Sequence, residues 1–167
     1  SLENRILVLD VKGGQAIQTI PNERNDFLSY PQWSDNESSV VYLARRDSKI
    51  CMLKYELASG RTTPLTDWSS HAIGAYDIYQ GVVYFNASFS GINNIYAVHA
   101  NGDKRIYQIS SVPVGADMPA VSPNGESIAL TEQTIGGKQL SLLSLDKNAF
   151  SSSSLKVIEP PDMERYG

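Results

Sequence analysis

The chain repeats one pattern along its length, and this repeat limits the fold more than any other feature. The pattern is an apolar strand, a short polar step, a turn that contains glycine in three of its four copies, and a second strand. It reads ILVLDVKGGQAIQTI, MLKYELASGRTTPLT, IYAVHANGDKRIYQIS and LSLLSLD, beginning at Ile6, Met52, Ile95 and Leu140. These starting points are 46, 43 and 45 residues apart, which is about the length of one four-stranded blade of a β-propeller. The spacing therefore predicts an all-β chain built from propeller blades.

Each copy alternates apolar and polar residues and is broken by a turn, as expected for a half-buried antiparallel hairpin. In the third copy the pair Asn101-Gly102 separates the apolar runs 95–98 and 106–109. Because both residue types tolerate a positive φ, this pair predicts a tight hairpin. The repeated pattern should thus supply the last two strands of each blade.

A second shared tract lies upstream of three of the four starting points. It reads YPQWSDNESSVVYLAR from Tyr30, AYDIYQGVVYFNAS from Ala75 and MPAVSPNGESIALTE from Met118. In each copy an inner strand leads through a turn into an apolar second strand, and the turn 122–125 is strongly specified by its Pro-Asn-Gly sequence. The two tracts together predict the four strands of one blade. We expect the core at Ile6, Val8, Val41, Met52, Val83, Ile95, Ile128 and Leu140.

These motifs resemble the TolB-like repeat, whose blades carry a pattern near P-x-W-S-P-D-G and close on Leu-Thr. The matching residues are Pro31, Trp33 and Ser34 in one copy, Pro119, Ser122, Pro123 and Gly125 in another, and Pro64, Leu65 and Thr66 at the end of a third. The likeness covers roughly residues 5 to 158. Departures occur at Asn124, where the family has Asp, at the altered turn 34–37, and in the middle copy, which keeps only Gly81. The resemblance implies an incomplete β-propeller, with Trp33 packed between blades.

The phase of the repeat divides the chain into about three and a half blades. Residues 1–24 give the last two strands of one blade, 25–69, 70–112 and 113–159 give three fuller blades, and 160–167 lead into a further one. The last full blade is expected to close on the strand 155–158. Such an array cannot close by itself, since propellers typically have four to eight blades. We therefore expect a piece of a longer propeller, or self-association that covers the open ends.

Composition excludes some classes of partner. The net charge is −4 and the pI is near 5.1, and basic residues cluster only at Arg45-Arg46 and Lys104-Arg105, so a nucleic-acid partner is not expected. No apolar run approaches the ~20 residues of a membrane span, and no leader precedes Ile6. We expect neither a signal segment nor a membrane span.

The reactive residue types do not form a catalytic, cofactor-binding or metal-binding motif. Cys51 is the only cysteine and is expected to be a small side chain at the start of a strand; His71 and His99 are the only histidines and lie outside any metal-binding motif. His99 is expected to be a hydrogen-bonded structural residue. The sequence contains no Gly-x-Ser-x-Gly elbow. We expect no catalytic residues, no cofactor and no metal. Trp33 is expected to pack in the core, whereas for Trp68 two roles stay open, packing in the core or facing a ligand.

Two functions remain after these exclusions. The chain is either a non-catalytic scaffold that binds a protein or peptide, or the substrate-gating propeller of a larger peptidase or hydrolase, which the resemblance also allows. The resemblance favours a periplasmic or other extracytoplasmic location. Binding surfaces are expected on the loops that approach the inner strands, 25–30, 71–77 and 113–117, and on 45–49, 89–93 and 133–138.

Overall fold

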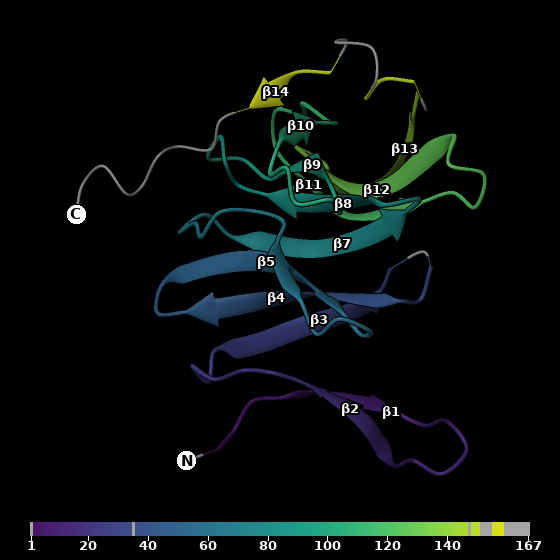
Figure 1. The fold of residues 1–167 in the computed structure, drawn as a ribbon. Coiled ribbons are helices and arrows are strands. Elements are labelled where there is room, and N and C mark those ends of the chain that lie inside the picture. Colours follow the sequence, from purple (N-terminus) through teal and green to yellow (C-terminus); the bar gives the residue numbers. More distant parts are fainter. Residues whose placement is uncertain (1, 35, 147, 151–154, 159–167) are drawn as a thin grey trace.

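The computed structural model describes residues 2–34, 36–146, 148–150 and 155–158 of the chain. All regular secondary structure in these residues is β-strand, and neighbouring strands pair antiparallel. Figure 1 shows the sheets stacked in chain order, from the purple hairpin near the N-terminus to the green strands. The prediction of an all-β, incomplete propeller is confirmed for this part of the chain.

The strands form four sheets, which we number as blades in chain order. The first blade holds β1 (Ile6–Leu9) and β2 (Ala16–Ile20). The second holds β3 (Phe27–Trp33), β4 (Ser39–Arg46), β5 (Lys49–Glu56) and β6 (Thr62–Pro64). The third holds β7 (Ile73–Tyr79), β8 (Val82–Ala87), β9 (Asn94–His99) and β10 (Ile106–Gln108), and the fourth holds β11 (Ala116–Val121), β12 (Ser127–Thr134) and β13 (Gly137–Ser144).

Three apolar clusters lie between successive blades and hold the stack together. Val41 and Leu43 of β4 point into the cluster shared with the third blade, whereas Val40 and Tyr42 point into the cluster shared with the first. The first six residues of β4 are therefore buried in an unbroken run, because a strand covered on both faces has no polar side. The core is thus divided among blade interfaces instead of gathered at one centre.

Seven of the eight predicted core residues are buried, with exposures of 8% or less. The prediction for Leu140 is wrong, because this side chain is 77% exposed. Ile128 of the paired strand β12 faces the third blade and is fully buried, but Leu140 lies on the other face of the fourth blade. No described sheet covers that face, so Leu140 and its neighbour Leu142, which is 76% exposed, meet solvent.

The pairing of the last strand also differs from the prediction. Residues 155–158 were expected to close the fourth blade beside β13, but β14 (Val157–Ile158) pairs with β10 and extends the third blade by a fifth strand. Its Ile158 packs against the cluster between the second and third blades, which gives the strand an apolar contact there. The expected lead-in at 160–167 lies outside the described residues.

The turns after β3 and β11 have the same geometry although their sequences differ. Gly125 donates its N–H to Ser122 O at 2.8 Å, and Glu37 donates to Ser34 O at the same distance. Ser122 Oγ also donates a hydrogen bond to Asn124 Oδ1 at 2.6 Å, as Ser34 Oγ donates one to Asn36 Oδ1 at 2.7 Å. Glu37 therefore occupies the position of Gly125 and adopts a left-handed φ of 54°, where Gly125 has 71°.

Candidate functional site

The predicted binding loops lie at one end of the blades because of the strand register. Phe27 at the start of β3 pairs with Arg45 at the end of β4, and Ile73 and Ala116 pair in the same way with the ends of β8 and β12. The loop into each inner strand therefore meets the turn after each second strand. We call this surface the approach rim; it consists of residues 25–30, 45–49, 71–77, 89–93, 113–117 and 133–138.

A bidentate ion pair holds the rim of the second blade. Arg46 donates from Nε to Asp26 Oδ1 at 2.7 Å and from Nη2 to Asp26 Oδ2 at 2.6 Å. The Asp26 side chain is 9% exposed and that of Arg46 is 35% exposed. The guanidinium also lies 4.5 Å from the ring centroid of Trp68, and its bonds to Asp26 raise the pKa of Arg46. This pair fixes the entry of β3 against the end of β4.

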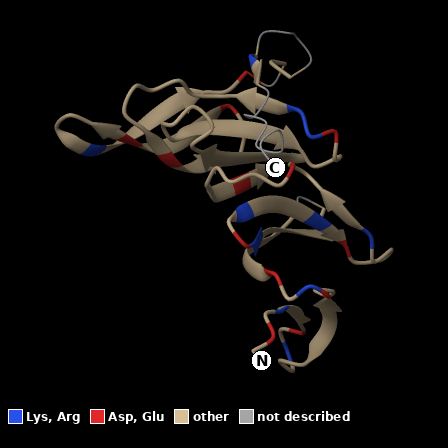
Figure 2. Ribbon diagram, turned by 90° about the vertical axis from the view of Figure 1, so that its left-hand side faces the viewer, with Lys and Arg blue, Asp and Glu red and all other residues tan. Residues whose placement is uncertain are grey.

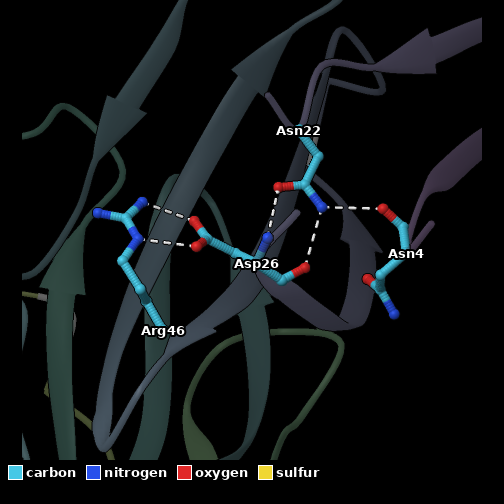
Figure 3. Close-up of polar contacts among 4 residues, drawn as sticks. All are labelled: Asn4, Asn22, Asp26 and Arg46. Carbon is cyan, nitrogen blue, oxygen red and sulfur yellow. Dashed lines mark hydrogen bonds and ion pairs between the residues drawn. The ribbon is translucent and has the colours of Figure 1, made fainter. Parts of the chain in front are cut away.

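Two asparagines connect the ion pair to the N-terminal segment, as Figure 3 shows. Asn22 Oδ1 accepts from Asp26 N at 3.0 Å, and Asn22 Nδ2 donates to Asp26 O at 2.9 Å and to Asn4 O at 2.8 Å. Asn4 Oδ1 in turn accepts from Leu28 N at 2.7 Å. The crossover between the first and second blades is therefore tied to both blades by side-chain bonds.

Hydrogen bonds also fix the approach rim at the third and fourth blades. Asn93 Nδ2 donates to Asp117 Oδ1 at 3.0 Å, and Asn93 O accepts from Ala116 N at 2.8 Å. Gln133 N donates to Gly115 O at 2.8 Å. A turn of the third blade thus holds the inner strand of the fourth, so that the rim continues across the interface between the two blades.

The rim exposes apolar side chains on this fixed backbone. Phe27 is 58% exposed, Val114 46%, Ile92 37% and Ile135 fully exposed. In the described part of the chain, charged residues of both signs are spread over the blades without a block of one sign (Figure 2). The surface chemistry of the rim is therefore mixed and partly apolar.

The single cysteine and the two histidines occupy structural positions. Cys51 is fully buried in β5, and burial raises the pKa of its thiol to about 11. His71 and His99 are partly buried; His71 lies edge-on to Phe89 at 6.0 Å, and the ring of His99 meets Tyr107 at 5.8 Å. Among the described residues the side chain of His99 makes aromatic contacts, to Tyr107 and to Phe150 at 5.2 Å, and not the expected hydrogen bond. Within the described residues no group of three His, Cys, Asp or Glu side chains forms a metal-binding cluster.

The two tryptophans differ from each other in setting. The prediction that Trp33 is a core residue between blades is wrong, because the side chain is 50% exposed. In the described residues the first blade has two strands, and this narrow sheet leaves part of the inner strand β3 uncovered. Trp68 is partly buried against the apolar cluster of the first two blades and stacks on Arg46. Sequence reasoning missed the pair Asp26–Arg46, although each residue stands beside a predicted strand end.

No helix among the described residues is long and apolar enough to cross a membrane. No family model matches the chain, and no curated protein is significantly similar to it. Solved structures do match. A protein described as TolB from Agrobacterium tumefaciens is 21% identical with a TM-score of 0.61, and the match covers 78% of this chain and 48% of that one.

Two further structures share the architecture. The computationally designed protein Ika4 is 15% identical with a TM-score of 0.55, covering 86% of this chain and 81% of the designed one. A puromycin-hydrolyzing peptidase from Mycobacterium tuberculosis is 14% identical with a TM-score of 0.55, covering 94% of this chain and 29% of the peptidase. The chain thus spans about half of the TolB structure and under a third of the peptidase. At these identities the matches concern the fold alone, and they identify the chain as an incomplete β-propeller with the fold of TolB-like proteins.

Proposed function

We propose that the chain is a non-catalytic scaffold that binds a protein or peptide partner on the approach rim. The observation that carries this proposal is the combination of a fixed backbone with exposed apolar tips. Asp26–Arg46 and Asn93–Asp117 hold the loops, while Phe27 is left 58% exposed. A surface that is already ordered loses less conformational entropy on binding, and this favours recognition of a partner.

The proposal extends to the kind of partner and to the location. Mixed charge and exposed apolar groups suit a polypeptide better than a nucleic acid, which requires a basic surface. We place the protein outside the cytoplasm, in the periplasm or an equivalent compartment, on the strength of the TolB-like resemblance.

A peptide-display selection tests the proposed rim. The purified chain is used as bait, and selected peptides are then measured for affinity against variants. Phe27→Ser and Ile92→Ser should each weaken binding about tenfold, because each removes an apolar contact. Leu142→Ser is the matched control, since Leu142 is also apolar and exposed but lies on the outer face of the fourth blade. Peptides that bind both rim variants as tightly as the unaltered chain would contradict the proposal.

A substrate-gating role in a larger peptidase or hydrolase is the second candidate. It is favoured by the fold match to the mycobacterial peptidase, which covers nearly the whole chain. In that case the approach rim or the opposite rim would face a catalytic domain. The two functions are distinguished by adding the chain in trans to a peptidase domain from the same parent protein: gating requires a change in the preference for long over short substrates, and scaffolding predicts none.

A further inference from the structure

The chain contains two Asn-Gly pairs, and each lies in a turn of the propeller. Asn101-Gly102 joins β9 to β10, and Asn124-Gly125 joins β11 to β12. Both asparagines are exposed, and the two glycines have left-handed φ angles of 86° and 71°. In such a pair the main-chain nitrogen of the glycine can attack the side-chain amide of the asparagine, because glycine has no side chain to obstruct the approach. The same chemistry is therefore available in principle at two places in one molecule.

The turn at Asn124-Gly125 holds both reacting nitrogen atoms in hydrogen bonds. Gly125 is buried, and its N–H donates to Ser122 O at 2.8 Å. Asn124 Nδ2, the atom that would leave, donates to Glu126 Oε2 at 3.0 Å. The attack requires the glycine nitrogen to lose its proton to water and the amide nitrogen to depart, so both bonds must break first. The fold thus protects this pair.

The turn at Asn101-Gly102 leaves the corresponding nitrogen atoms available. Gly102 is partly exposed, and among the described residues no acceptor lies in hydrogen-bonding geometry with its N–H or with Asn101 Nδ2. Asn101 Oδ1 accepts from Asp103 N at 3.0 Å, which places a donor beside the oxygen that becomes negative during the attack. An equivalent bond joins Glu126 N to Asn124 Oδ1 at 3.1 Å. The two pairs therefore differ at their nitrogen atoms and not at this oxygen.

The charges beside the two turns act in opposite directions. Lys54 Nζ donates to the carbonyl of Ala100, directly before Asn101, and Lys54 and Asn101 line the same cavity of about 540 Å³. A positive charge there favours the deprotonated main-chain nitrogen and the carboxylate that the reaction forms. At the other turn the carboxylate of Glu126 contacts the amide of Asn124 and disfavours both species.

Packing between blades requires the glycine at position 102. A Cβ on Gly102 would lie 2.6 Å from Thr63 Cγ2 of the second blade, and the φ of 86° disfavours any side chain. The third blade also has apolar interfaces with both the second and the fourth blade, so this turn does not border an open end of the array. The fold itself therefore maintains the reactive pair.

We propose that Asn101 is a site of spontaneous deamidation, at which the folded chain converts asparagine to isoaspartate and aspartate with water as the co-reactant. The nitrogen of Gly102 bonds to Cγ of Asn101, and the bond from Cγ to Nδ2 breaks. Nδ2 leaves as ammonia with the proton that Gly102 gives up, and a succinimide ring remains. Water then opens the ring: attack on the main-chain carbonyl gives isoaspartate, and attack on Cγ gives aspartate.

Both products place a new carboxylate beside Lys54. Isoaspartate also inserts a methylene group into the main chain, in a turn whose Gly102 packs on Thr63. The modification should therefore disturb the contact between the second and third blades. This inference goes beyond the proposed function and does not depend on it.

The test incubates the purified, folded chain at neutral pH and follows both Asn-Gly pairs by peptide mapping with mass spectrometry. Conversion changes the mass of the peptide, and chromatography separates isoaspartate from aspartate. Asn101 should convert at least about tenfold faster than Asn124, which serves as the control within the same molecule. In guanidinium chloride, where both turns are lost, the two rates should become similar. The denatured sample also shows that conversion at either pair is detected.

Variants test the part assigned to charge. Lys54→Met should slow the conversion of Asn101 about threefold, as expected for a partly exposed charge, and Lys138→Met is the matched control because Lys138 is exposed on another blade. Equal rates in these two variants would overturn the role of Lys54. A folded chain in which Asn101 converts no faster than Asn124 would overturn the proposal, and so would a rate difference that persists unchanged in guanidinium chloride.

Discussion

Removal of the Arg46 side chain should destabilise the protein more than removal of the Asp26 charge. Arg46→Met keeps most of the aliphatic length but leaves the Asp26 carboxylate, 9% exposed, without its bidentate partner. Asp26→Asn instead leaves a guanidinium that is 35% exposed and still stacks on Trp68. The two changes break the same ion pair, but each leaves an unpaired charge in a different environment.

The expected magnitudes follow from this asymmetry. Loss of one partner of a fully buried ion pair costs about 3–5 kcal/mol, mostly as the penalty for the remaining buried charge. The partial exposure of this pair reduces the figure, and we expect about 2 kcal/mol for Arg46→Met. For Asp26→Asn we expect about 1 kcal/mol, because water reaches the guanidinium and the amide retains one acceptor.

Urea unfolding followed by circular dichroism measures the free energy of unfolding of each variant. The m value, the slope of this free energy against urea concentration, is compared among the variants to confirm that the same transition is observed. The double variant Arg46→Met with Asp26→Asn should be more stable than Arg46→Met alone, since it removes the unpaired Asp26 carboxylate. Arg45→Met is the matched control, because Arg45 is exposed. A cost for Arg46→Met no larger than for Asp26→Asn, or for Arg45→Met, would refute the reasoning.

Four further results are expected. Glu37→Gly should raise the free energy of unfolding by up to about 1 kcal/mol in the same urea experiment, because the left-handed φ of 54° strains a side-chain residue; no gain would contradict the shared turn geometry. Cys51 should resist iodoacetamide at pH 8 until urea unfolds the chain, because burial raises its pKa to about 11, and rapid labelling of the folded chain would show the thiol to be accessible. The chain should self-associate in sedimentation experiments at micromolar concentration, because Leu140 and Leu142 are 77% and 76% exposed on an uncovered sheet face. Replacing both leucines with serine should weaken this self-association, and a monomeric unaltered chain would contradict the prediction. Ester, peptide and phosphoester substrates should not turn over with or without divalent metals, and turnover lost on replacing one serine or histidine would reveal a catalytic site.

Strand positions and pairings could be predicted from the repeat because they depend on local patterns. The Asn101-Gly102 hairpin is present, with Ile106 paired to Val98, and Gly102 has a φ of 86°. The alternation of apolar and polar residues indicates which side of a strand is apolar. It does not indicate whether another sheet covers that side, and for this reason the core prediction for Leu140 is wrong. The core prediction for Trp33 came from the family resemblance, which likewise does not show how wide the neighbouring sheet is.

The candidate site was predictable only as a set of loops. Asp26 precedes one strand and Arg46 ends the next, and an antiparallel hairpin brings such positions together, so a signal for their contact existed in the sequence. The contact of Asn93 with Asp117 had no such signal, because it joins two blades and depends on how they stack. The pairing of β14 with β10 likewise depends on a choice between two sheet edges that the strand sequence does not encode.

The division of the core between blade interfaces separates residues that are neighbours in the chain. Val40 and Val41 are joined by a peptide bond, yet they belong to different apolar clusters. Val41 instead shares its cluster with Phe85, which lies in the next blade. Energetic coupling in this protein should therefore follow blade interfaces: substitutions at the two adjacent valines should act almost independently, while substitutions at Val41 and Phe85 should depend on each other.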